Sequence, residues 1–239
     1  MRSLLFVPGD SEKKLEKGLT SGADVLLIDL EDSVAAGAKA AARTITSAFI
    51  AKARVLAARP KLYVRINALE TGLVEADLDG VMAAAPDGIM LPKSEAGTDI
   101  TRLDAKIAVR EATFDLADGS TRIIAIATET AGALFGLGSY RGASRRLVGL
   151  AWGGEDLSAD LGALGTKEEG GGWTAPYRLA RSLNLFGAVA AGVTPIDTVY
   201  TNFRDLEGLE AECRLTARDG YTAKMAIHPA QVEVINRVY

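Results

Sequence analysis

The chain has 239 residues, of which 48% are hydrophobic, and a formal net charge of −4, so it can bury one large core but lacks the clustered cations that sequence-independent binding of nucleic acid needs. Its one cysteine, Cys213, cannot form an internal disulfide; the N-terminus lacks a secretory signal, and no apolar run approaches the roughly 18 residues that span a bilayer. We therefore expect a single cytoplasmic domain over residues 1–239 that acts on small molecules and binds neither nucleic acid nor a membrane.

Eight apolar runs, rich in β-branched residues, recur along the chain. Six of them are continuous or nearly so, which is typical of parallel strands buried on both faces and not of a half-exposed antiparallel sheet. In chain order the predicted strands are LLFV (4–7), VLLIDL (25–30), LYVRI (62–66), GIMLP (88–92), RIIAIAT (122–128), RLVGLAW (146–152), TPIDTVY (194–200) and AKMAIH (223–228).

The segments between these runs have the spacing of apolar residues that is typical of helices. They cover residues 11–22, 35–58, 73–85, 98–114, 132–144, 177–192 and 206–220, and a last helix follows residue 228. Ser11 is a plausible cap at one start, and glycines such as Gly22 follow several ends. Eight βα units in a chain of this length predict an α/β fold of the TIM (β/α)₈ type, a closed barrel of eight parallel strands.

An open doubly wound sheet is the competing prediction, because it is built from the same local elements. A dinucleotide-binding version of that fold has the motif GxGxxG directly after its first strand. Here the residues after LLFV are PGDSEKK. The barrel is therefore favoured.

Carboxylates gather at the predicted C-terminal ends of the strands, where barrels of this kind assemble their active sites. Crowded carboxylates repel one another unless a cation lies between them, and hard oxygen donors in a chain with one histidine favour Mg²⁺ or Mn²⁺ over Zn²⁺. Glu129 and Asp156 follow neighbouring strands and suit the one or two carboxylates that Mg²⁺ commonly takes. The alternative is that they form ion pairs with Arg65 or Lys93 and only close the barrel mouth.

Arg65 lies inside the apolar run LYVRI, where an unpaired cation is costly. Its guanidinium is suited to hold a substrate carboxylate or a developing enolate oxygen. The alternative is a structural salt bridge to Asp29 or Glu31. Glu31 and Glu155 are also candidates to accept a hydrogen bond from a metal-bound water.

Three further features of the sequence bear on the site. We assign Gly153 and Gly154, with Glu155, to substrate binding, since glycines let a ligand approach the backbone, although they also suit a plain turn. The segment GTKEEGGGWTAPY (165–177) is interpreted as a mobile loop over the mouth, either a substrate lid or disorder. His228 is the only histidine, and a lone histidine is more often packed than catalytic.

Seven motifs in order give the chain a resemblance to a known family over nearly its whole length. The motifs are RSLLFVPGD, DVLLIDLEDSV, YVRIN, GIMLPK, IATETAGAL, LAWGGEDLSADLG and IHPAQV. They resemble the HpcH/HpaI aldolase and citrate lyase superfamily, in particular its branch of citrate lyase β-subunit-like and malyl-CoA or citramalyl-CoA lyase proteins. Seven ordered motifs are much more specific than any one of them.

The resemblance implies a Mg²⁺-dependent carbon–carbon lyase, with Mn²⁺ as a possible substitute. Glu129 of ATET and Asp156 of GGEDL would hold the metal. Arg65 of YVRIN would bind the substrate's oxygens, and Glu31 and Asp32 of LEDSV would support water molecules and Arg65. Arg65, Glu31 and Asp32 are therefore the expected catalytic residues. The implied substrate is a CoA thioester, a 3-hydroxy-3-carboxyacyl-CoA such as malyl-, citramalyl- or citryl-CoA. The same resemblance suggests a homotrimer or hexamer.

Three other activities remain open at this point. An aldolase of the same superfamily would cleave free hydroxy-keto acids, but such enzymes commonly have an additional histidine near the first helix, and none occurs before His228. A thioesterase and a β subunit that works only inside a multi-subunit citrate lyase are the others. CoA-using members continue beyond IHPAQV into an extension that can supply an acid, whereas this chain stops at Tyr239, either cut short or lacking that part, so the general acid or base is unassigned.

Overall fold

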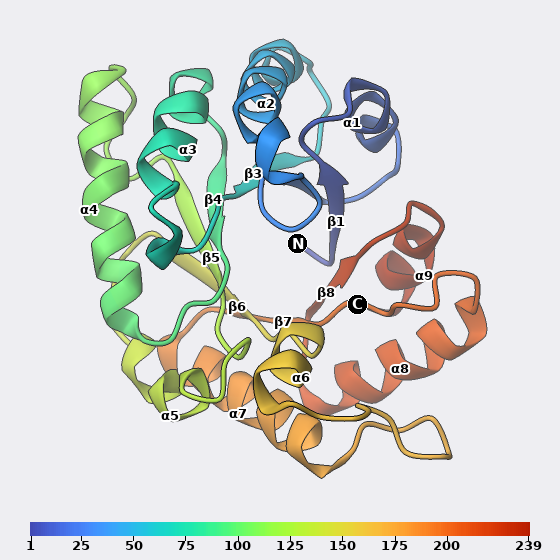
Figure 1. Cartoon of the computed structure of the whole chain (residues 1–239). Helices are drawn as coiled ribbons and strands as arrows, with labels where there is room; N and C mark the ends of the chain where they lie inside the picture. The colour runs from blue at the N-terminus through green and yellow to red at the C-terminus, as the bar shows by residue number, and fades with distance from the viewer.

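The computed structural model describes residues 1–239 and contains a closed barrel of eight parallel strands, hydrogen-bonded in chain order. Figure 1 shows the strands as an inner ring with the helices around it. Because β1 pairs with both β2 and β8, the sheet has no edge, and the predicted TIM barrel is confirmed against the open sheet. The strands are β1 (Ser3–Pro8), β2 (Val25–Asp29), β3 (Lys61–Arg65), β4 (Gly88–Leu91), β5 (Arg122–Ile126), β6 (Leu147–Ala151), β7 (Thr194–Asp197) and β8 (Ala223–Ala226).

Nine α-helices surround the barrel, and every predicted helical segment overlaps one of them. They are α1 (Glu12–Leu19), α2 (Lys39–Arg54), α3 (Val74–Val81), α4 (Gly97–Thr113), α5 (Ala133–Gly136), α6 (Glu155–Leu161), α7 (Ala175–Ala191), α8 (Leu206–Asp219) and α9 (Ala230–Val238). Short 3₁₀ helices flank them at η1 (Ala36–Ala38), η2 (Leu69–Thr71), η3 (Met82–Ala84) and η4 (Leu137–Tyr140). The sequence did not predict α6. None of the helices has the length and apolar character that crossing a membrane requires.

Side chains alternate between two hydrophobic layers along each strand, as the period of two in a β-strand requires. On β2, for example, Val25 and Leu27 point into the barrel, and Leu26 and Ile28 pack under the helices. The outer layer is the larger one, with 38 buried residues against 11 inside the barrel. Both faces of the strands are therefore apolar, and polar side chains are left mainly for the two ends of the barrel.

Candidate active site

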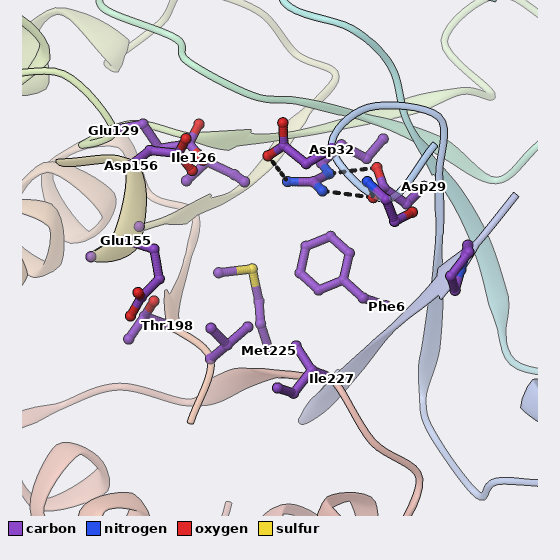
Figure 2. Close-up of a pocket in the computed structure, with 16 residues that line it drawn as sticks. Phe6, Asp29, Asp32, Ile126, Glu129, Glu155, Asp156, Thr198, Met225 and Ile227 are labelled. Carbon is purple, nitrogen blue, oxygen red and sulfur yellow. Dashed lines mark hydrogen bonds and ion pairs between the residues drawn. The ribbon is translucent and has the colours of Figure 1, made fainter. Parts of the chain in front are cut away.

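A cavity of about 440 Å³ opens at the C-terminal ends of the strands, and Arg65, Glu129 and Asp156 are among the residues that line it. Figure 2 shows the carboxylates of Glu129 and Asp156 on one side of the cavity, with the apolar side chains of Phe6 and Met225 facing it from β1 and β8. The cavity therefore has a charged wall and an apolar wall, at the end of the barrel where the sequence predicted the site.

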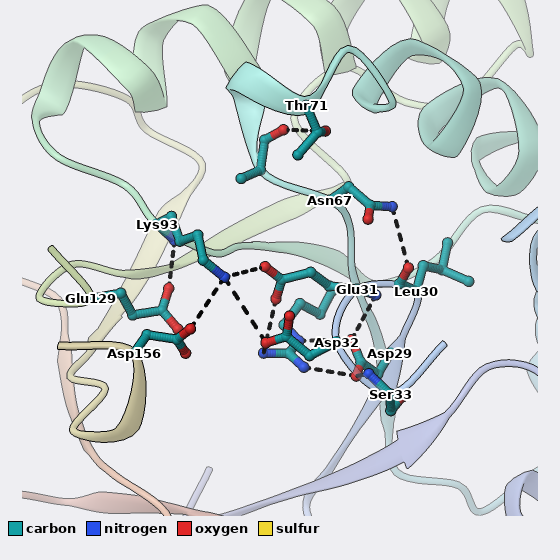
Figure 3. A network of polar contacts seen from close by, with 12 residues as sticks. Asp29, Leu30, Glu31, Asp32, Ser33, Asn67, Thr71, Lys93, Glu129 and Asp156 are labelled. Atoms are coloured by element: carbon teal, nitrogen blue, oxygen red, sulfur yellow. Dashed lines mark hydrogen bonds and ion pairs between the residues drawn. The ribbon is translucent and has the colours of Figure 1, made fainter. Parts of the chain in front are cut away.

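Glu129 and Asp156 lie side by side although they come from different βα units (Figures 2 and 3). Glu129 follows β5 and is only 3% exposed, whereas Asp156 lies in the first turn of α6 with its side chain 36% exposed. Burial raises the pKa of Glu129 to about 8, and the negative charges of Asp156 and Glu31 add to the shift. The protein therefore holds a buried carboxyl group here without a full positive charge directly against it.

Gly153 allows this close arrangement of the two βα units. A Cβ atom at position 153 would lie 2.8 Å from Cγ of Glu129, closer than carbon atoms approach without overlap. The backbone N–H of Gly153 also donates to Oγ1 of Thr128 at 3.0 Å. A Cβ at Gly154 would lie 3.1 Å from the ring of Trp173. Both glycines are thus explained by contacts within the protein, and both line the cavity as well.

Arg65, at the end of β3, makes the salt bridges that the sequence left as an alternative. Its Nε and Nη2 donate to the two carboxylate oxygens of Asp29, each at 2.7 Å, and Nη1 lies 3.0 Å from Glu31 and 3.6 Å from Asp32. Although burial opposes its charge, the hydrogen bonds to Asp29 and the nearby carboxylates raise the pKa of Arg65 above its ordinary value. The group is a permanent cation in the cavity wall, and the guanidinium lies 4.8 Å from the ring centre of Phe6.

Asp29 is a site residue that the sequence analysis did not select. It is 2% exposed, and besides Arg65 it accepts hydrogen bonds from the backbone N–H groups of Glu31 at 2.9 Å and Ser33 at 3.0 Å. Asp29 therefore fixes both the guanidinium and the loop that carries Glu31 and Asp32. The available signal was a carboxylate at the end of the otherwise apolar strand VLLID.

Lys93, which follows β4, lies between the pair Glu129 and Asp156 and the carboxylates that surround Arg65 (Figure 3). Its Nζ lies 2.6 Å from Glu31 and 3.5 Å from Asp156, and its backbone N–H donates to Glu129 at 2.5 Å. The ion pair between Lys93 and Asp156 that the sequence left open is therefore present. The backbone of Lys93 has a φ of +50°, in the left-handed region, and this conformation costs a residue other than glycine about 1 kcal/mol. The surrounding contacts hold the residue in this conformation.

Glu155 and His228 lie away from the pair formed by Glu129 and Asp156. The side chain of Glu155 is exposed and points toward Thr198, away from the carboxylates of Glu129 and Asp156 (Figure 2). The ring of His228 stacks on Phe203 with 4.7 Å between ring centres, and its Nδ1 accepts from the N–H of Ala230 at 3.2 Å. His228 is thus a packed, hydrogen-bonded histidine.

The segment 165–177 does not cover the cavity, because none of its residues lines it. Lys167 and Trp173 form a bridge to one another and both contact Glu212 of α8 at 3.3 Å. Figure 1 shows this segment running beside α8. Trp173 also packs edge-on against Trp152, with 5.0 Å between ring centres. The structure therefore shows no lid over the mouth, because the buried side chain of Trp173 holds the segment beside α8 through Glu212 and Trp152.

Comparison with protein-family models gives one match, to HpcH/HpaI aldolase/citrate lyase, over residues 2–229. The chain belongs to this family. It is 34% identical to the citrate lyase subunit beta of Leuconostoc mesenteroides subsp. cremoris over 238 residues, which is 100% of this chain and 76% of the relative. It is also 34% identical to a (3S)-malyl-CoA thioesterase of Cereibacter sphaeroides, over 100% of this chain and 76% of that protein.

A solved structure from the same family has the same fold. It is the protein CitE from Mycobacterium tuberculosis in complex with magnesium, acetoacetate and coenzyme A, which is 30% identical with a TM-score of 0.81, over 100% of this chain and 80% of that one. In the present family member no three His, Cys, Asp or Glu side chains are grouped in a way that could hold a metal ion. Glu129 and Asp156 are thus a pair of carboxylates with no third such side chain grouped with them.

Proposed function

We propose that this family member is a Mg²⁺-dependent carbon–carbon lyase, with residues 1–239 as one catalytic domain. The proposed substrate is a 3-hydroxy-3-carboxyacyl-CoA such as malyl-, citramalyl- or citryl-CoA, which the enzyme cleaves to a keto acid and an acyl-CoA or forms in the reverse, Claisen-type direction. The observation that carries the proposal is the pair of carboxylates, Glu129 and Asp156, in a cavity whose wall also contains Arg65.

The chemistry of the donor set fits a magnesium ion. Mg²⁺ takes one or two protein carboxylates and leaves its other positions to water and substrate, and Mn²⁺ accepts the same oxygen donors. Glu129 is buried with a backbone N–H as its hydrogen-bond donor. Oε2 of Glu31 is buried, and its contact with Nη1 of Arg65 at 3.0 Å is an ion pair without hydrogen-bond geometry, so this oxygen can still accept a hydrogen bond from an ordered water. Magnesium bound by Glu129 and Asp156 would supply a Lewis acid for the hydroxyl or keto oxygen of the substrate.

Arg65 has the donors that bond cleavage needs. When the carbon–carbon bond breaks, the hydroxyl group gives its proton to water and becomes the carbonyl of the keto acid, and the electron pair of the bond moves to the thioester as an enolate. The α-carbon of the enolate then takes a proton from water and gives the acyl-CoA. Asp29 accepts hydrogen bonds from Nε and Nη2 of Arg65, whereas Nη1 forms only ion pairs, with Glu31 at 3.0 Å and Asp32 at 3.6 Å. Its N–H groups can therefore donate to the enolate oxygen. Since its pKa is raised, Arg65 stabilises negative charge and does not accept the proton.

The other groups of the cavity have supporting tasks in this proposal. Glu31 and Asp32 lie close to Nη1 of Arg65 and orient it with water molecules. Phe6 and Met225 exclude water from the apolar wall, which strengthens the charge interactions on the opposite side. Gly153, Gly154 and Glu155 border the space that the acid portion of the substrate would fill.

The relatives support the substrate class and also favour a second candidate. The CitE protein binds magnesium, acetoacetate and coenzyme A, which is consistent with a keto acid and a CoA thioester at this site. The similarity to a (3S)-malyl-CoA thioesterase favours hydrolysis of the thioester as the second candidate. Hydrolysis gives the free hydroxy acid and CoA, whereas lyase cleavage gives a keto acid and an acyl-CoA, so the products distinguish the two.

The test is to incubate the purified protein and Mg²⁺ with malyl-, citramalyl- and citryl-CoA and to measure keto acid, acyl-CoA and free CoA separately. We expect keto acid and acyl-CoA to appear in equal amounts from at least one thioester, and EDTA to stop the reaction. Free CoA without keto acid would assign the protein as a thioesterase. Absence of turnover with all of the thioesters would refute both activities.

Replacing Gly153 by alanine is expected to weaken Mg²⁺ binding about tenfold and to lower the free energy of unfolding by about 1–2 kcal/mol. The added Cβ overlaps the side chain of Glu129, so either this side chain or the backbone at position 153 must shift. Overpacking of this kind has costs of this size. Titration calorimetry and thermal unfolding measure the two effects. Gly138→Ala is the matched control, because a Cβ at that position meets no atom within 4 Å; equal behaviour of the two variants would contradict the prediction.

A further inference from the structure

Lys93 contacts both proposed metal ligands without being a suitable ligand itself, because a protonated amine offers no lone pair. Its backbone N–H donates to Oε2 of Glu129 at 2.5 Å. Lys93 follows Pro92, and the φ of +50° at Lys93 turns the chain sharply after β4. The next N–H, of Ser94, donates to the carbonyl of Ile126 on β5 at 3.1 Å. The left-handed conformation thus aims one N–H at Glu129 while the chain stays attached to the strand that carries it.

The side chain of Lys93 lies between the proposed metal ligand Asp156 and the carboxylates beside Arg65, Glu31 and Asp32. Its ammonium lies 2.6 Å from Glu31, 3.5 Å from Asp156 and 3.9 Å from Asp32. Its side chain is 32% exposed, against 8% for Glu31, so water screens this charge only in part. A cation bound by Asp156 would be close to this ammonium and would be repelled by it. Lys93 therefore competes with a metal for the same negative charge.

We propose that Lys93 is a positioning residue that acts as an internal counter-ion of the metal site. Its backbone N–H orients Glu129, and its ammonium holds Asp156 and Glu31 together before a metal binds. After binding, the same positive charge lowers the affinity for the metal, so that the ion stays exchangeable. This inference rests on the proposed metal site formed by Glu129 and Asp156.

The experiment is calorimetric titration of Mg²⁺ into the metal-free full chain and its variants. Lys93→Met removes the charge and keeps the backbone N–H, and we expect it to tighten Mg²⁺ binding about tenfold, which is the size expected for one partly screened charge near a divalent ion. Lys93→Gly should tighten binding equally, because it also keeps the N–H and suits the left-handed backbone. Lys93→Arg, which keeps the charge, should stay within twofold of the unmodified protein.

Lys52→Met is the matched control, since Lys52 pairs with Glu16 on the exposed surface and its loss should not change Mg²⁺ affinity. Unchanged or weaker binding in both Lys93→Met and Lys93→Gly would overturn the counter-ion role and leave the metal site standing. Tightening of the same size in Lys93→Arg would also overturn it, because charge would not be the cause. If the unmodified protein bound neither Mg²⁺ nor Mn²⁺, the metal site and this inference would fall together.

Discussion

Glu129→Gln is expected to abolish Mg²⁺ binding and to lower kcat/KM for the thioester substrate by at least about 10³-fold, a loss of roughly 4 kcal/mol of transition-state stabilisation. The amide has the shape of the carboxyl group and can still accept the hydrogen bond from the N–H of Lys93, but it cannot supply an anionic ligand. Because burial already disfavours the charged form of Glu129 and raises its pKa to about 8, replacing it by a neutral amide should not lower the free energy of unfolding of the metal-free protein. Calorimetry, turnover and chemical denaturation measure these three quantities.

A pair of companion variants makes the test for Glu129 selective. Asp156→Asn should cause a comparable loss of metal binding, because it removes the second carboxylate. Glu155→Gln changes the neighbouring residue in the same helix turn, whose side chain points toward Thr198 (Figure 2), and it should leave Mg²⁺ affinity within about twofold. If Glu129→Gln bound Mg²⁺ as tightly as the unmodified protein, the proposed ligand set would be wrong.

Arg65→Met is expected to damage both activity and stability. The change leaves Asp29, which is 2% exposed, as a buried carboxylate without its cation, and breaking a buried pair in this way costs about 3–5 kcal/mol. Turnover should fall at least about 10²-fold, because the donors for the enolate oxygen are lost. Urea denaturation and steady-state kinetics under Mg²⁺ saturation measure the two effects.

The double variant Asp29→Asn with Arg65→Met separates the two roles of Arg65. Removing the second partner relieves the unpaired charge, and the asparagine oxygen can still accept a hydrogen bond from the loop that Asp29 holds. We therefore expect the double variant to recover much of the stability and none of the activity. If activity returned together with stability, Arg65 would have only a structural role.

The barrel could be predicted from the sequence because its signal is local. Parallel strands covered on both sides are continuous apolar runs, such as VLLIDL and RIIAIAT, and each of the eight runs overlaps a strand of the structure. The end of each strand then places its polar residues at one rim, which made Glu129 and Asp156 candidates among several carboxylates, and the resemblance to a known family favoured these two; Arg65 was selected as a cation inside an apolar run. Strand order indicated only that such residues share one rim of the barrel.

The features that the sequence did not predict depend on contacts between distant segments. Helix α6 has seven residues, too few for an amphipathic period to stand out, and it begins directly after two glycines. Lys93 follows a proline in GIMLPK, and nothing local indicates its left-handed backbone or its contact with Glu31, although its ion pair with Asp156 was one of the alternatives that the sequence left open. Trp173 pins the segment 165–177 through Trp152 and Glu212, so a stretch with three glycines is held in place by one aromatic side chain.

The barrel is closed by the pairing of β1 with β8, which we call its seam. This pairing affects the apolar wall of the cavity and the charged wall differently during folding. β1 and β8 pair through Ser3–Leu5 and Lys224–Ala226, from opposite ends of the chain, whereas every other pairing joins strands that are neighbours in sequence. Closing so long a loop has the largest entropic cost of any pairing here, so we expect the seam to form last and to open first in hydrogen-exchange measurements. The charged wall lies on β2 to α6, outside the pairing of β1 with β8, whereas Phe6 on β1 and Met225 on β8 lie on the two sides of that seam. Transient opening would therefore wet the apolar wall while the carboxylates keep their geometry.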